Sequence, residues 1–418
     1  MSHPGATVLP PPSERARQLC EQMLEFVREH VLPAEADYAA YRRKSGAEDH
    51  SVPPVVEDLK REARRRGLWN LFLPAESGLT QLEYAPIAEL SGWSPELAPE
   101  AINSAAPDTG NMELLHLLGT PEQKQEWLQP LLDGRIRSAF AMTEPDVASS
   151  DATNIATRIE RDGDEYVITG RKWWISNGMD PRLRLFIAMG KTDPAAPVHL
   201  QQTMVIVPAG TPGVTVVRDL PVFGRHDRQG HVELRFDGAR VPVRNVLGVE
   251  GGGFAAAQAR LGPGRIHHCM RALGAAERAL ALLVARATSR VAFGGPLAEQ
   301  GVVQQQIAES RLEIEQARLL CHAAAATIDA EGNKAARHLV ALAKVAVPRA
   351  ATAVIDRAIQ VHGGAGMSDD SPLAAMYGLH RAMRLFDGPD EVHLRSIARA
   401  ELRRTPLLPP NKSRTGGT

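Results

Sequence analysis

Apolar residues recur at helical spacing in the first third of the chain. Leu19, Met23 and Phe26 fall on one face of a helix, with polar residues between them. We therefore expect an N-terminal helical domain over residues 1–137. Residues 1–12 are rich in Pro and are expected to form a disordered lead-in.

Between residues 138 and 249 the apolar pattern changes to that of short strands. Runs of apolar and β-branched residues are bounded by Gly, Pro or Asp. The pair Asp162-Gly163 between the first two runs is a signal for a tight hairpin turn. The pattern predicts a compact antiparallel β domain in the middle of the chain.

After Gly251-Gly-Gly253 the chain becomes rich in Ala and Leu, and helical spacing returns. Small and apolar residues from Val303 to Cys321 line one face of a long helix, as in a bundle. We expect a C-terminal four-helix bundle over residues 250–406 and a Pro- and Gly-rich tail over residues 407–418. The predicted fold class is α+β, in the order helix, β, helix.

Charge and composition narrow the classes of function. The 418 residues carry a formal net charge of -1, which offers no basic field for nucleic acid or anionic membranes. No window approaches the roughly 18 uninterrupted apolar residues of a membrane span. The three cysteines show no zinc or disulfide spacing, and a cytoplasmic location fits them best.

Three blocks of sequence carry the candidate chemistry. The first is Phe140-Ala-Met-Thr-Glu-Pro-Asp-Val-Ala-Ser-Ser150 followed by Lys172-Trp-Trp-Ile-Ser-Asn-Gly178, the second is Gln360-Val-His-Gly-Gly-Ala-Gly366, and the third is Phe386-Asp-Gly-Pro-Asp-Glu-Val-His393. In this order they resemble the TEPxxGSD, KxWITNG, QxxGGxG and catalytic-carboxylate segments of the acyl-CoA dehydrogenase family. The resemblance covers nearly the whole chain.

The first block has the groups that a flavin needs. Backbone donors in a Pro-fixed turn, small hydroxyls and the flat ring of Trp174 suit the edge and face of an isoalloxazine. The resemblance implies FAD as cofactor, with the hydroxyl of Ser176 approaching flavin N5. The residues that it implies at the FAD site are Phe140, Met142, Thr143, Ser149, Trp174, Ile175, Ser176, Arg290, Phe293, Gln360, Gly363, Gly364, Pro389 and Glu391.

The resemblance also implies where the substrate and a second subunit lie. Ser150, Arg265 and Gly388 match positions that meet the acyl-CoA. Because this copy departs from TEPxxGSD, the roles of Ser149 and Ser150 remain interchangeable. Family members build part of each FAD site from a neighbouring subunit, so a homotetramer, a dimer of dimers, is implied.

Asp387 is the candidate catalytic base. The resemblance places it where the family usually has a Glu that removes the α-proton of the thioester, and such a base is expected to have a raised pKa. An Asp at a helix joint can instead be an N-terminal cap for the following helix. The form DGPDEVH resembles the subgroup found in eukaryotes fused to kinase-like domains.

The expected function is FAD-dependent oxidation of an acyl-CoA to the trans-2-enoyl-CoA, with an electron-transferring flavoprotein as acceptor. Two alternatives stay open: a nitroalkane oxidase-like flavin oxidase, which also uses an Asp base, and a catalytically silent acyl-CoA-binding protein. No metal site is expected at His267-His268, because adjacent residues on a helix point apart.

Overall fold

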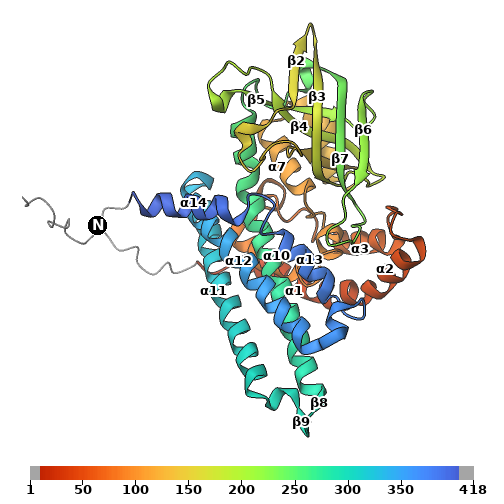
Figure 1. Ribbon diagram of the computed structural model, residues 1–418, viewed down its shortest axis with the longest axis vertical. Helices are drawn as coiled ribbons and strands as arrows, with labels where there is room; N and C mark the ends of the chain where they lie inside the picture. The colour runs from red at the N-terminus through yellow and green to blue at the C-terminus, as the bar shows by residue number, and fades with distance from the viewer. Residues whose placement is uncertain (1–9, 404–418) are drawn as a thin grey trace, which may run out of the picture.

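A computed structural model describes residues 10–403 (Figure 1). The predicted tail and all but the last three residues of the predicted lead-in lie outside this range. The N-terminal part is helical, and apolar residues such as Met23 and Phe26 are fully buried in its core. Its α-helices and π-turns are α1 (Glu14–Phe26), η1 (Val27–Val31), α2 (Leu32–Ser45), α3 (Pro54–Arg65), α4 (Pro74–Ser77), α5 (Gln81–Ser91), α6 (Ala98–Ala101), α7 (Asp108–Leu118), α8 (Pro121–Gln123), η2 (Lys124–Leu128) and α9 (Gln129–Leu132).

The middle of the chain forms one seven-stranded sheet. Its strands are β1 (Arg137–Ala141), β2 (Arg158–Asp162), β3 (Glu165–Ser176), β4 (Leu183–Lys191), β5 (Gln202–Pro208), β6 (Val214–Asp219) and β7 (His231–Pro242), with short 3-10 turns η3 (Ala152–Asn154), η4 (Val198–Leu200) and η5 (Val243–Asn245). The predicted hairpin is confirmed, because β2 pairs antiparallel with β3 and Gly163 has a φ of +63°.

The prediction of a purely antiparallel domain was wrong in one respect. β1 pairs parallel with β4, and β2 adds one parallel pairing to β4. Parallel neighbours need a long crossover connection. The hairpin of β2 and β3 lies between β1 and β4 in sequence and provides that length, which short apolar runs alone do not reveal.

Three long helices build the C-terminal domain. They are α10 (Gly253–Ser289), α11 (Gly301–Glu331) and α12 (Asn333–His362), and they pack with the shorter α13 (Leu373–Ala382) and α14 (Asp390–Glu401). The hairpin of β8 (Val291–Ala292) and β9 (Gly295–Pro296), followed by η6 (Leu297–Glu299), joins α10 to α11, and η7 (Gly363–Met367) follows α12. Figure 1 shows β8 and β9 at the end of the bundle remote from the sheet.

Within residues 10–403, one helical stretch is long and apolar enough to cross a membrane by length and composition. It is Asn333–Met367, which contains α12, and 61% of its most apolar window is buried inside the protein. A mostly buried helix that contacts both α10 and α11 is what the centre of a bundle requires.

Candidate active site

A buried ion pair holds the first sequence block in shape. The Lys172 ammonium on β3 donates to Glu144 Oε1 at 2.8 Å and to the carbonyls of Met142 and Met189 at 2.8 and 2.6 Å. Glu144 also accepts from the backbone N–H groups of Ala156 and Thr157. The Glu and Lys of the two motifs therefore join the turn after β1 to the sheet.

The turn uses one of its two serines and leaves the other exposed. Ser149 Oγ accepts from the backbone N–H of Glu144 at 2.8 Å and so closes the turn on itself. Ser150 is exposed and makes no side-chain hydrogen bond within the described residues. This geometry favours Ser150 as the serine that is free to meet a ligand, and its contact with substrate stays a prediction.

Trp174 and Ser176 lie on the same strand next to this turn. Trp174 sits in a β-bulge of β3 at a φ of +55°, and 44% of its surface is exposed. Thr143 is tied to the same strand, because its hydroxyl and carbonyl both bond the backbone of Trp173. Ile175, between Trp174 and Ser176, is buried.

Asp387 occupies a strained position between α13 and α14. It is a non-Gly residue at a φ of +54°, a conformation that usually costs free energy and is kept at functional sites. Arg265 Nε donates to the Asp387 carbonyl at 2.8 Å. Lys344 Nζ donates to the neighbouring Phe386 carbonyl at 2.9 Å. Gly388 follows at a φ of +96°, where a Cβ would lie 2.9 Å from His393 Nε2.

The capping interpretation of Asp387 is wrong. The N-cap of α14 is Pro389, and no side chain caps this helix. The nearby carboxylate that is engaged structurally is Asp390, whose Oδ2 accepts from Arg349 and Arg384 at 3.0 and 2.9 Å. Asp387 instead faces His268, whose Nε2 lies 3.5 Å from its Oδ2.

The charges of several basic side chains act on the Asp387 carboxylate. Burial alone raises the pKa of Asp387, but the nearby charges of His268, Arg260, Lys344 and Arg265 outweigh it and lower the pKa below its usual value. This differs from the raised pKa expected for the base. Burial lowers the pKa of His268 to about 3, so this ring is neutral at neutral pH, where the positive charges that act on Asp387 are those of Arg260, Lys344 and Arg265.

The remaining residues of the predicted FAD site lie around the hairpin between α10 and α11, at the end of α12 and at the start of α14. Arg290 is the C-cap of α10 and directly precedes the β8–β9 hairpin at the remote end of the bundle (Figure 1). Phe293 lies in the turn of this hairpin and is fully exposed. Gln360, Gly363 and Gly364 at the end of α12 are exposed, and both glycines face open space. Pro389 and exposed Glu391 begin α14 beside Asp387. Within one chain, the β8–β9 hairpin lies far from strand β3, which carries Trp174 (Figure 1).

Sequence reasoning missed several residues at the site. His268 was considered only as a metal ligand, yet it faces Asp387 and accepts from Arg271 at 3.2 Å through Nδ1. Arg260 stacks over the Phe140 ring at 3.9 Å, and Lys344 is almost fully buried. A basic residue that faces the inside of a helical bundle is a signal for a role in a buried site. The sequence reveals this signal only if it is known which face of the helix points inward.

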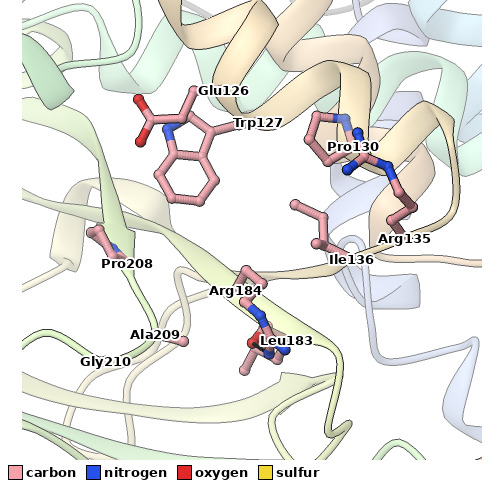
Figure 2. A pocket seen from close by; sticks show the side chains of 10 residues that line it. All are labelled: Glu126, Trp127, Pro130, Arg135, Ile136, Leu183, Arg184, Pro208, Ala209 and Gly210. Carbon is pink, nitrogen blue, oxygen red and sulfur yellow. Dashed lines mark hydrogen bonds between the residues drawn. The ribbon is translucent and has the colours of Figure 1, made fainter.

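A separate pocket of about 460 Å³ opens between η2 and the strands β4 and β5 (Figure 2). Trp127 and Pro130 line one side, and Arg184 and Pro208 line the other. None of the predicted site residues lines it, so it does not bear on the chemistry at Asp387.

The chain belongs to the acyl-CoA dehydrogenase family. The N-terminal, middle and C-terminal domain models of acyl-CoA dehydrogenase match residues 13–135, 139–239 and 251–402. A Mycobacterium tuberculosis protein named "Probable acyl-CoA dehydrogenase FadE2" is 67% identical over 94% of this chain and 96% of its own length. "Acyl-CoA dehydrogenase family member 11" of Gallus gallus is 55% identical over 93% of this chain, which spans 51% of that relative.

Solved structures agree with the family and the fold. A structure from Mycobacterium abscessus is 47% identical with a TM-score of 0.89 and covers 94% of this chain and 99% of its own. Butyryl-CoA dehydrogenase from Megasphaera elsdenii is 27% identical with a TM-score of 0.78 and covers 94% of this chain and 99% of its own. The predicted order of helical, β and helical domains is thereby confirmed, and the protein is an acyl-CoA dehydrogenase-type oxidoreductase.

Proposed function

We propose that the protein removes hydrogen from the α and β carbons of an acyl-CoA and produces the trans-2-enoyl-CoA, with Asp387 as the base. The observation that carries this proposal is the clamped, strained backbone of Asp387, whose side chain serves no helix cap and faces His268 on α10. Strain held in place by Arg265 and Lys344 is typical of a residue kept for function.

FAD is the cofactor, as in the family. The residues fit it: an exposed indole face at Trp174 stands beside the hydroxyls of Ser176 and Thr143 and the turn from residue 142 to 150. When bound, FAD supplies the acceptor for the hydride that leaves the β carbon. The exposed guanidinium of Arg290 has no partner among residues 10–403 and suits the pyrophosphate end, and its place at the far end of the bundle supports a site completed by a second subunit.

The first step that we assign to the protein's residues is removal of the substrate's α-proton by Asp387. An ionised Asp387 carboxylate accepts the α-proton, and the cations around it keep it ionised until substrate arrives. The α-carbon must lie within hydrogen-bonding reach of the carboxylate, so the backbone clamp at Arg265 sets the geometry for this shorter acid. The backbone N–H of Asp387 is the expected donor to the developing enolate oxygen.

The proposal also includes an electron acceptor, an oligomeric assembly and a cellular location. An electron-transferring flavoprotein is the expected acceptor, and a homotetramer is the expected assembly. Full exposure of Phe293 and the exposed glycines after α12 support burial of these surfaces by a second copy. A cytoplasmic location remains a prediction, supported by the free cysteines Cys20, Cys269 and Cys321.

The test is anaerobic reduction of the bound flavin by a panel of acyl-CoAs, with CoA and nitroethane as comparison. We expect acyl-CoA to bleach the flavin and Asp387→Asn to slow bleaching by about 10²–10⁴-fold, as loss of a general base does, with FAD still bound. Asp390→Asn is the matched control, because this carboxylate binds Arg349 and Arg384 and not the reacting site. Bleaching by nitroethane alone would favour the oxidase, and unchanged bleaching in Asp387→Asn would reject Asp387 as the base.

A further inference from the structure

Ser176, His231 and Asp227 form a hydrogen-bonded row beside Trp174. Ser176 Oγ lies 3.0 Å from His231 Nδ1, and His231 Nε2 lies 2.7 Å from Asp227 Oδ2. The two ring nitrogens are thus both engaged, one by a hydroxyl and one by a carboxylate. The order hydroxyl, imidazole, carboxylate is that of a proton-transfer chain.

The sheet builds this row. Ser176 at the end of β3 and His231 at the start of β7 are direct cross-strand partners, so their side chains emerge side by side. The backbone N–H of His231 donates to Asp219 Oδ1 at 3.0 Å, which fixes the entry of β7. Asp227 lies in the loop that leads into this strand, four residues before His231.

The charge on Asp227 determines how the protons are arranged. Burial raises the pKa of Asp227, but the hydrogen bond from His231 and the charges of Arg225 and Arg42 outweigh it and lower the pKa. An ionised carboxylate only accepts hydrogen bonds, so His231 Nε2 must carry a hydrogen. When the ring carries a single hydrogen, on Nε2, its Nδ1 is bare and the Ser176 hydroxyl donates to it.

The row runs from the interior toward solvent. The His231 side chain is 18% exposed and that of Asp227 is 38% exposed. Trp174 packs against the imidazole, with 6.2 Å between the ring centroids. Arg225, Arg42 and Glu96 are the further charged groups that act on Asp227. A half-buried hydroxyl is therefore joined to water through two titratable groups.

We propose that Ser176, His231 and Asp227 relay a proton out of the flavin site after the substrate has been oxidised. The proposal rests on the assignment of Ser176 to the FAD site in the proposed function. The substrate loses one proton to Asp387 and one hydride, and a hydride equals one proton and two electrons. When the two electrons pass to an external flavoprotein acceptor, the hydride's proton must leave as well.

The relay accounts for that proton. Ser176 Oγ takes it up while the original hydroxyl hydrogen passes to His231 Nδ1. His231 gives its Nε2 hydrogen to Asp227, which releases it to water. The hydroxyl rotates back, and the part-exposed ring returns to its starting tautomer by exchange with water, which supplies a proton to Nε2 and takes the one on Nδ1, with no net change in protons. The net result is one proton in the solvent for each hydride taken from substrate.

The experiment that tests the relay isolates the step in which electrons leave the reduced flavin. The flavin of the purified holoenzyme is reduced with dithionite under anaerobic conditions and reoxidised with ferricenium, in H₂O and in D₂O. We expect His231→Gln and Asp227→Asn to slow reoxidation by about tenfold or more, since positioned proton transfer contributes at least that much. The wild-type solvent isotope effect should shrink in both variants. His226→Gln is the matched control, because His226 bonds Asp219 and lies outside the row.

A second measurement does not depend on the flavin. Solid-state NMR of ¹⁵N-histidine-labelled protein should show His231 with hydrogen on Nε2 and a bare, hydrogen-bonded Nδ1, and Asp227→Asn should shift this tautomer balance. Unchanged reoxidation in both variants, or hydrogen on Nδ1 with a bare Nε2, would overturn the relay. Dithionite needs no acyl-CoA, so failure of acyl-CoA to bleach the flavin counts against the proposed function and leaves the relay to be judged by its own result.

Discussion

Arg265 Nε donates to the backbone carbonyl of Asp387 at 2.8 Å, across 122 residues of sequence. The donor lies on α10, and Lys344 on α12 holds the preceding carbonyl in the same way. Two helices of the bundle therefore set the position of the candidate base through its backbone. The carboxylate itself is left free to face His268 and the substrate side.

Replacement of Arg265 by Lys should slow the chemistry without loss of the cofactor. A flexible ammonium does not reproduce the directed Nε bond, and a displacement of roughly 1 Å at the base costs on the order of a hundredfold in rate. We expect anaerobic flavin reduction by acyl-CoA to slow by about ten- to a hundredfold in Arg265→Lys. Arg337→Lys, at an exposed position of α12, is the control. Equal rates in the two variants would show that the clamp does not position Asp387.

The pH dependence of kcat/KM should reflect the lowered pKa of Asp387. The cations favour the ionised base, so activity in the free enzyme persists as pH falls and is lost only below the usual Asp value of 3.8. The ion pairing also stabilises the fold at higher pH, and this contribution disappears as pH falls through the lowered pKa.

Lys344→Met removes one of these cations and leaves the burial in place. The acid limb of kcat/KM should then move to higher pH. Stopped-flow flavin reduction between acidic and neutral pH measures the shift, with a thermal melt of each variant as the control for folding. An acid limb that does not move would mean that Lys344 acts on the backbone alone.

Glu144→Gln should destabilise the protein strongly, because it leaves the Lys172 ammonium buried without its anion. Breaking a buried pair on one side costs about 3–5 kcal/mol. Chemical denaturation would measure the loss. The double variant Glu144→Gln with Lys172→Met should recover part of it, since no uncompensated charge remains. A single variant as stable as the wild type would show that the turn after β1 does not depend on this pair.

Glu113 should make stability fall as pH rises. Burial raises the pKa of Glu113 to about 8, and its Oε2 has no hydrogen-bond partner among the described residues. The native state keeps this proton while the unfolded chain loses it above about 4.5. The contribution of Glu113 to the free energy of unfolding is therefore fully present below about pH 4.5. It declines by about 1.4 kcal/mol per pH unit between there and pH 8.

Glu113→Gln should remove this decline, because an amide does not ionise. Free energies of unfolding between pH 5 and pH 9 would compare it with Glu126→Gln, a change at an exposed position. Identical pH slopes in wild type and Glu113→Gln would contradict a protonated buried acid at this position.

The sequence by itself determined the order of helical, β and helical domains and placed the hairpin turn at Gly163. Both follow from local physics: the period of apolar residues differs between helix and strand, and Asp-Gly tolerates the turn's backbone. The motif blocks also indicated the family, because they match it in residue type and order. The location of Asp387 at a joint between two helices was predicted in the same way.

Only the tertiary structure decided what those residues do to one another. The parallel pairing of β1 with β4, the cations around Asp387 and the row from Ser176 to Asp227 all join residues far apart in sequence or on different strands. Such contacts depend on helix phase and strand register. The sign of the pKa shift at Asp387 depends on the balance between burial and neighbouring charge, and that balance exists only once α10, α12 and the joint before α14 have packed together.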